Sequence, residues 1–155
     1  MKELMFMKIA VDAALENVLT NGGGPFGAVV VRNGQIISIG RNQVTTINDP
    51  TAHAEIQAIR TACRNLNSFQ LTGCELYTSC EPCPMCLGAI YWARLSKVYY
   101  ACTNEDAAKI GFDDQYIYKQ IALPPDKRSI PMLRVLPENT YLPFNAWIQK
   151  PHQQY

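Results

Sequence analysis

"CELYTSCEPCPMCLGAIYWARL", residues 74–95, places a strand, a cysteine-rich turn and a helix in direct succession. Residues 74–79 are rich in β-forming side chains and predict a buried strand. Residues 82–95 predict a helix, because a proline in the first turn costs no amide hydrogen bond. Between them, Cys80, Cys83 and Cys86 fall within seven positions. Such thiols can form a disulfide, enclose a structural metal, or bind a metal that keeps one coordination position for reaction, and the spacing alone permits all three.

Strands and helices alternate around this stretch. Residues 26–31 and 35–40 predict two strands, joined by a hairpin at Asn33 and Gly34 because both residues tolerate a positive φ. The other expected elements are helices at residues 51–66 and 113–123 and a strand at residues 97–102. A hairpin followed by this alternation predicts an α/β fold, a three-layer α/β/α domain with a mixed central sheet. Residues 1–155 form one such domain by length.

The first 19 residues predict an amphipathic helix that stops at the glycine-rich residues 21–25. Its polar faces carry Lys8, Asp12 and Glu16. Its apolar positions recur at helical spacing and are Leu4, Met7, Val11, Leu15, Val18 and Leu19.

The composition is that of an ordinary globular protein, with 48% hydrophobic residues and a formal charge of +1. Lys and Arg are scattered, so we expect no nucleic-acid partner. The start of the chain lacks the pattern of a secretory signal, and no apolar run reaches the roughly 20 residues of a membrane helix. We therefore expect a cytoplasmic protein with no membrane partner, where clustered cysteines bind metal or react more often than they form disulfides.

His53, Cys83 and Cys86 are the expected metal ligands. A catalytic zinc takes three protein ligands and a water molecule, and imidazole and thiolate are ligands that zinc prefers. Cys83 and Cys86 are three positions apart at the start of a helix, so they share one face. The free amides and the helix dipole there favour the thiolate form.

Glu55 is the residue that distinguishes a catalytic site from a structural one. A carboxylate beside a ligand can take a proton from a zinc-bound water and return it to a leaving group. Residues two apart point about 200° away from each other on an ideal helix. His53 must therefore lie in an irregular first turn, or the ion must lie near the helix axis.

Two alternatives give the cysteines another role. Cys80 as a fourth ligand would close the site and make it structural, but Cys80 precedes the helix and Glu55 would then have no function. A zinc-stapled binding module without chemistry is the corresponding non-enzymatic function. We interpret Cys63, Cys74 and Cys102 as small core residues.

The motif H-x-E followed by P-C-x-x-C is typical of zinc-dependent nucleobase deaminases. The segments "GGPFGAVVV", "NQVTTINDPTAHAEIQAIR", "LYTSCEPCPMCLGAIYWAR" and "GFDDQYIYK" extend this likeness, and the chain resembles the small bacterial guanine deaminases of the cytidine-deaminase fold. The resemblance implies hydrolysis of guanine to xanthine and ammonia, one Zn²⁺ per subunit with water as fourth ligand, and Glu55 as the proton carrier.

The resemblance also implies residues that bind the purine base. Asn42 contacts a purine edge, Phe26 lines a flat slot, and Ala54 offers a backbone group between the two neighbouring site residues. Asp114 accepts hydrogen bonds from the base and relays a second proton. Each has a structural alternative: Asn42 as a turn cap, Phe26 as a core residue, and Asp114, or its neighbour Asp113, as a helix cap. Glu81 is expected to hold backbone amides or a neighbouring side chain.

Residues 124–155 contain six of the ten prolines, which predicts no independent helix or strand there. Their many apolar side chains must nevertheless lie against something. The resemblance implies a homodimer in which this segment is swapped onto the partner subunit and closes its site. Tyr155 would then lie over the partner's purine, or else be a frayed end.

Two rival activities share the metal motif. A tRNA adenosine deaminase usually carries a basic RNA-binding surface, which the sequence lacks. A deaminase of guanosine or cytosine differs in how much room the site leaves for a sugar.

Overall fold

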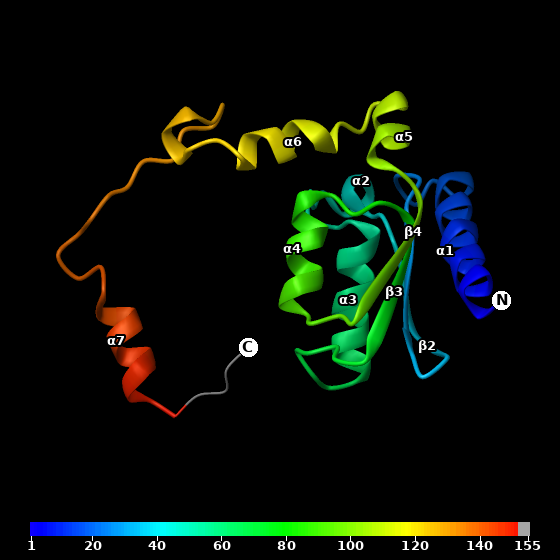
Figure 1. The fold of residues 1–155 in the computed structure, drawn as a ribbon, viewed down its shortest axis with the longest axis horizontal. Helices are drawn as coiled ribbons and strands as arrows, with labels where there is room; N and C mark the ends of the chain where they lie inside the picture. Colours follow the sequence, from blue (N-terminus) through cyan, green and yellow to red (C-terminus); the bar gives the residue numbers. More distant parts are fainter. Residues whose placement is uncertain (152–155) are drawn as a thin grey trace. The chain divides into compact units, whose positions relative to one another are not determined.

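The computed structural model describes residues 1–151 (Figure 1). The chain forms two compact units, Met1–Gln115 and Tyr116–Tyr155. The elements of the first are α1 (Lys2–Leu19), β1 (Gly27–Arg32), β2 (Gln35–Arg41), α2 (Val44–Ile47), α3 (Ala54–Asn65), β3 (Cys74–Cys80), α4 (Pro84–Trp92), β4 (Lys97–Cys102), α5 (Asn104–Lys109) and the start of α6 (Asp114–Ile121). The second contains the rest of α6, the 3-10 helix η1 (Pro125–Lys127) and α7 (Leu142–Gln149).

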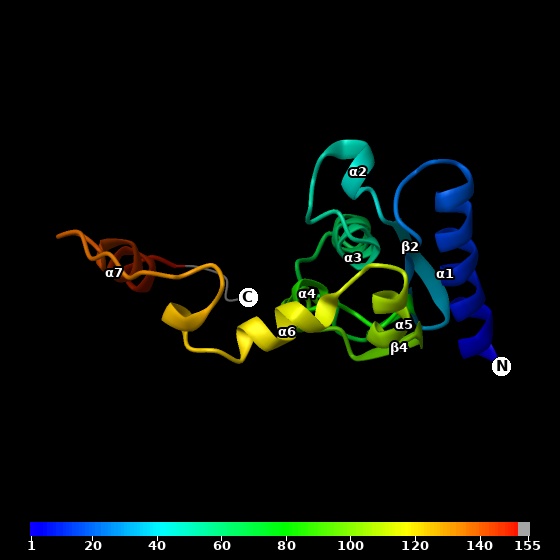
Figure 2. The ribbon, with the colours of Figure 1, turned by 90° about the horizontal axis from the view of Figure 1, so that it is seen from above.

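The four strands of the first unit form one mixed sheet in the order β2-β1-β3-β4. β1 pairs antiparallel with both β2 and β3, and β3 pairs parallel with β4. α1 covers one face of the sheet, and α3 and α4 cover the other (Figures 1 and 2). The predicted three-layer α/β/α fold is therefore confirmed.

Burial on both faces explains the sequence of β1. Ala28 and Val30 pack in the core beneath α3, whereas Val29 and Val31 pack with Phe6 of α1. A strand covered on both sides is continuously apolar rather than alternating. The hairpin that follows has the expected geometry, since Asn33 has φ of 52° and Gly34 has φ of 77°.

α1 turns a different face to the sheet from the one that its large apolar residues predict. Of those six residues, only Met7 packs against the core, and the other five are exposed. The buried face consists of Phe6, Ala10, Ala13, Ala14 and Asn17. The reason is steric, because the backbones of α1 and β1 nearly touch: a Cβ on Gly27 would clash with the carbonyl oxygen of Ala10 and lie 2.7 Å from the backbone nitrogen of Ala14. Only small side chains fit at this crossing.

Two further expectations are wrong. Cys102, interpreted as a core residue, is exposed, whereas Cys74 is buried as expected and Cys63 partly so. The proline-rich segment does form regular structure, namely η1 and the eight-residue helix α7. Each begins with a proline in its first turn, where the missing amide costs nothing. Among the described residues, no helix is long and apolar enough to cross a membrane.

Candidate active site

His53 lies immediately before α3 rather than inside it. It is the N-cap residue, with extended backbone angles of φ −68° and ψ 156°, while Ala54 begins the helix and Glu55 lies in its first turn. Because His53 does not have helical backbone angles, the separation of about 200° between residues two apart on an ideal helix does not apply to His53 and Glu55. The imidazole and the carboxylate can therefore address one point.

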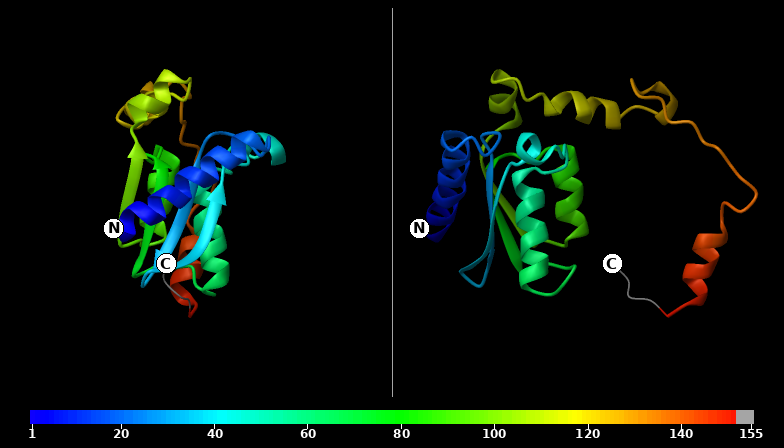
Figure 3. Two further views of the ribbon diagram at one scale, coloured as in Figure 1. Left: turned by 90° about the vertical axis from the view of Figure 1, so that its right-hand side faces the viewer. Right: turned by 180° about the vertical axis from the view of Figure 1, so that it is seen from behind.

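Cys83 holds the same position before α4. It is an N-cap with φ −67° and ψ 168°, and its Sγ accepts a hydrogen bond from the backbone nitrogen of Cys86 at 3.5 Å. The helix begins two residues later than the expected start at residue 82, and Pro84 lies in its first turn. Figure 3 shows α3 and α4 side by side with their first turns at the same end of the sheet.

The three expected ligands converge. The Nδ1 of His53 is 3.5 Å from both the Sγ of Cys83 and the Sγ of Cys86, and all three ligand atoms lie within 4.8 Å of one another. Ligand atoms of a tetrahedral zinc with the usual bond lengths are about 3.5–3.8 Å apart. The two distances from the His53 Nδ1 to the thiol sulfurs therefore match those around a zinc ion.

The electrostatics of this cluster favour a cation. Hydrogen bonds that the Cys83 thiolate accepts from the Cys86 thiol and, as a smaller effect, from the His53 imidazole lower the pKa of Cys83 to about 4. The same shared proton raises the pKa of Cys86, with burial acting in the same direction. A divalent ion supplies the positive charge that lets both thiols ionise.

Glu55 is buried, and it lines the same cavity as His53 and Cys83. Burial raises the pKa of its carboxyl group, and the Cys83 thiolate adds to the rise. Burial also raises the pKa of Asp114, again reinforced by Cys83. Carboxyl groups with raised pKa values in a cleft are typical of groups that accept and donate protons.

A cavity of about 210 Å³ opens over the cluster. Among the expected site residues it is lined by Phe26, Asn42, His53, Glu55, Cys83 and Asp114. Ala54 does not line it, and its side chain is buried in the core. Tyr155 lies outside the described residues.

A family model for the cytidine and deoxycytidylate deaminase zinc-binding region matches residues 1–102, which include all three ligands and Glu55. The chain belongs to this deaminase family. It is 58% identical to the guanine deaminase of Bacillus subtilis over 142 residues, 92% of this chain and 91% of that protein. The crystal structure of guanine deaminase from Bacillus subtilis matches with a TM-score of 0.94 at 54% identity, covering 97% of this chain and 96% of that one. A tRNA-specific adenosine deaminase of Aquifex aeolicus is 44% identical over 100 residues, 64% of this chain and 66% of that protein.

Cys80 stands apart from the ligand set of this deaminase. Its Sγ is 3.6 Å from the carbonyl oxygen of Thr103, to which it donates, and burial raises the pKa of Cys80 to about 12. The candidate metal cluster among the described residues comprises only His53, Cys83 and Cys86. The geometry therefore agrees with an open site.

Asn42 combines the two roles considered for it. Its Oδ1 accepts hydrogen bonds from the backbone nitrogens of Val44 at 3.2 Å and Gly24 at 3.3 Å, so it does cap a turn. It also lines the cavity of the deaminase. With the oxygen engaged twice, the Nδ2 is the group left for a ligand, and it can only donate.

Phe112 is a cavity residue that sequence reasoning missed. Its ring meets that of Phe26 edge to face, with centroids 4.8 Å apart and planes at 84°. Its position in the sequence, two residues before the expected site residue Asp114, could have identified it. Val44 and Thr45 of the short helix α2 also line the cavity and were not expected.

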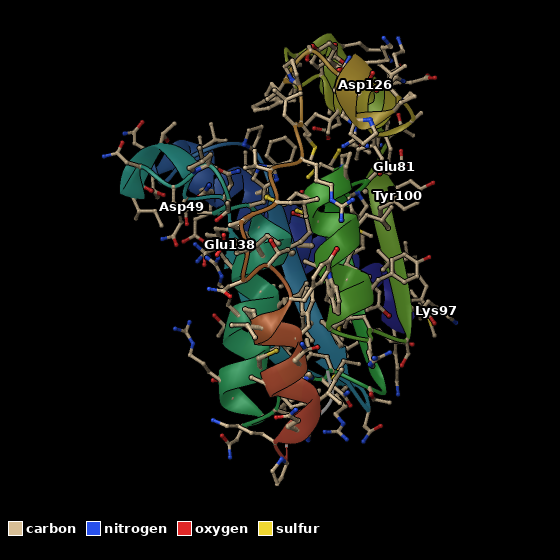
Figure 4. The ribbon with its side chains drawn as sticks, turned by 90° about the vertical axis from the view of Figure 1, so that its left-hand side faces the viewer. Asp49, Glu81, Lys97, Tyr100, Asp126 and Glu138 are labelled. Atoms are coloured by element: carbon tan, nitrogen blue, oxygen red, sulfur yellow. The ribbon has the colours of Figure 1, made fainter. Side chains whose placement is uncertain are left out.

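Glu81 has the structural role expected of it. Its Oε2 accepts a hydrogen bond from the backbone nitrogen of Asn104 at 3.0 Å, and its own nitrogen donates to the carbonyl oxygen of Cys102 at 2.8 Å. Figure 4 shows Glu81 near Tyr100, at one end of β4, whereas Lys97 lies at the other end of that strand. These bonds join the loop that carries Cys83 to the start of α5.

Proposed function

We propose that this deaminase hydrolyses guanine and water to xanthine and ammonia. The observation that carries the proposal is the buried Glu55 carboxyl group beside three convergent zinc ligands, in a chain that is 58% identical to a guanine deaminase over nearly its whole length. When bound, the zinc ion supplies a water of lowered pKa as nucleophile. His53, Cys83 and Cys86 would hold it.

Glu55 would carry the proton. Attack at C2 of guanine needs a base that removes a proton from the water and an acid that protonates N3. The carboxylate that remains would then take the proton of the hydroxyl group now on C2 and give it to the exocyclic amine, so that the C2–N bond breaks, ammonia leaves and C2 becomes a carbonyl carbon. The raised pKa of Glu55 suits a group that must hold a proton between these transfers.

The purine would lie against Phe26 and Phe112, with polar contacts at its edges. The Nδ2 of Asn42 would donate to an acceptor atom of the base. Asp114 would accept from N1–H and the 2-amino group, which are both donors, and could relay a second proton. The backbone of Ala54 would add a contact between His53 and Glu55.

The cavity supports a free base over a larger substrate. At about 210 Å³, it is smaller than the roughly 300–1,000 Å³ of pockets that take drug-sized ligands. The match to guanine deaminase spans 92% of the chain, whereas the match to the tRNA enzyme of Aquifex aeolicus spans 64%. Both comparisons favour guanine over adenosine in tRNA.

An ammonia-release assay tests the choice of substrate. Zinc-loaded protein is incubated in parallel with guanine, guanosine, cytosine, adenine and a tRNA anticodon hairpin. We expect one ammonia per xanthine from guanine and a much slower reaction with the others. Release from the hairpin or from guanosine at the higher rate would replace the guanine assignment with that activity.

We also propose that the protein is a homodimer with residues 124–155 swapped between subunits. Within this segment, Ile130, Leu133 and Val135 are each at least 80% exposed in the single chain. Apolar side chains on this scale are normally covered, and a second copy would supply the cover. The six cysteines are free thiols, which supports a reducing, cytoplasmic location.

A further inference from the structure

Asn17 is a buried amide on the otherwise apolar face of α1 that packs on the sheet. Only 3% of it is exposed. Its Nδ2 donates two hydrogen bonds, to the carbonyl oxygens of Gly24 and Asn42, each at 2.8 Å. Both acceptors belong to residues that line the cavity, although Asn17 itself does not.

The two acceptors are part of a closed network that includes Phe26. The carbonyl oxygen of Gly24 also accepts from the backbone nitrogen of Phe26 at 2.8 Å, and the nitrogen of Asn42 donates to the carbonyl oxygen of Phe26 at 3.2 Å. The nitrogen of Gly24 donates to the Oδ1 of Asn42 at 3.3 Å. Gly24, Phe26 and Asn42 thus form one hydrogen-bonded wall of the cavity, and Asn17 connects that wall to α1.

The chain fits closely around this amide. The backbone nitrogen of Gly22 donates to the carbonyl oxygen of Asn17 at 2.7 Å, and a Cβ on Gly22 would clash with the Oδ1 of Asn17. The amide is therefore confined on both sides. A polar group this deeply buried is retained where its hydrogen bonds fix a particular backbone arrangement.

We propose that Asn17 is a positioning residue for substrate binding, which holds the Asn42 and Phe26 wall at the distance that the purine requires. The inference rests on the proposed function, because it takes Asn42 and Phe26 as contacts of the base. Among the described residues, the Asn17 side chain donates to Gly24 and Asn42 and not to His53, Glu55, Cys83 or Cys86, which lie on α3, α4 and the residues preceding them. Its loss should therefore weaken binding and spare the proton transfers.

The size of the effect follows from the geometry. Without the Nδ2, the carbonyl oxygens of Gly24 and Asn42 lose a donor in a buried place, and the wall must relax to find another. The wall keeps its other hydrogen bonds, so only part of the binding free energy of the base should be lost. A loss of about 1.4 kcal/mol corresponds to a rise in KM of about tenfold.

The test compares Asn17→Ala with Asn65→Ala. Asn65 is a matched control, because its Nδ2 also donates to a backbone carbonyl at 2.8 Å, that of Ile37, from an exposed position at the end of α3. With guanine as substrate, we expect Asn17→Ala to raise KM about tenfold while kcat stays within about twofold and zinc content is unchanged. Asn65→Ala should leave KM as in the wild type.

A double mutant separates positioning from packing. If Asn17 acts in part by positioning the Asn42 side chain, then Asn17→Ala should raise KM by a smaller factor in an Asn42→Ala background than in the wild type. An unchanged KM in the single variant, or a full additional effect in the double mutant, would overturn the role. Asn17→Leu, which fills the same space without a donor, should raise KM as Asn17→Ala does.

Failure of both Asn17 variants to fold would assign the residue to stability and also overturn the positioning role. Failure of the wild type to release ammonia from guanine would refute the proposed function instead. The two failures are distinguishable, because an active wild type with unaffected Asn17 variants refutes only the inference about Asn17.

Discussion

His53 and Cys83 occupy the same position in two different helices. Each is the N-cap residue, their backbone angles differ by 1° in φ and 12° in ψ, and the Nδ1 of one lies 3.5 Å from the Sγ of the other. Two helix starts thus present a ligand to one point, and each is followed by a further site residue, Glu55 or Cys86. The metal centre therefore lies where the first turns of α3 and α4 come together.

Zinc binding should depend on Cys83 and not on Cys80. Replacing Cys83 by Ala removes one of three ligands, so zinc content should fall from one ion per chain toward zero. Cys80→Ala should keep a full zinc content, because its thiol bonds to the carbonyl oxygen of Thr103. Metal analysis of both purified variants checks this, and loss of zinc in Cys80→Ala would show a closed, four-ligand site.

Metal-free protein should be more stable at neutral pH when Glu55 is replaced by Gln. Burial raises the pKa of Glu55 above its ordinary value of 4.5, so the folded state binds a proton more tightly than the unfolded state. Its contribution to stability is present at low pH and is lost as pH rises through the raised pKa. Urea unfolding should show Glu55→Gln more stable at pH 7, with the difference vanishing below about pH 4.5. Equal stability of the wild type and Glu55→Gln at pH 7 would contradict the presence of a buried carboxylate at this position.

Asp114 should matter for substrate binding, and its neighbour Asp113 should not. Asp114→Asn puts an amide where two donors of guanine need a charged acceptor, so KM should rise about tenfold or more, since hydrogen bonds to charged groups contribute about 1.5–3 kcal/mol. Asp113→Asn makes the same chemical change one position earlier and serves as the control. Steady-state kinetics of both variants decide between a binding role and a helix cap.

Removing residues 153–155 should lower turnover much more than it lowers folding stability. The swapped tail would place Tyr155 over the partner's purine, whereas its loss leaves the sheet and its helices intact. Kinetics and thermal unfolding of the truncated protein provide the comparison. Unchanged kinetics would refute a role of the tail as a lid.

Local sequence patterns predicted the sheet and the metal cluster well. The Asn33–Gly34 hairpin and the strand at residues 97–102 depend on neighbouring residues. The strand has the predicted bounds, and the two hairpin strands differ from theirs by at most one residue at either end. The ligands were found from residue type and spacing, because imidazole and thiolate are groups that zinc prefers and Cys83 and Cys86 share one face of a helix start. Such features need no knowledge of the tertiary fold.

Features set by contacts distant in sequence were missed. The buried face of α1 is chosen by how closely it crosses β1, which large apolar residues cannot reveal. Asn17 meets Asn42 across 25 residues, and the ring of Phe112 meets that of Phe26 from a distant part of the chain. The number of prolines wrongly predicted that no helix forms at α7, because Pro143 lies in the first turn, where a helix tolerates proline.

Turnover of guanine by Glu55→Gln tests the central claim most directly. The exposed Glu105 provides a matched control variant, Glu105→Gln. We predict that Glu55→Gln keeps its zinc and its fold but deaminates guanine about 100- to 10,000-fold more slowly than wild type, while Glu105→Gln is unaffected. A zinc-loaded Glu55→Gln protein that works at nearly the wild-type rate would contradict the account.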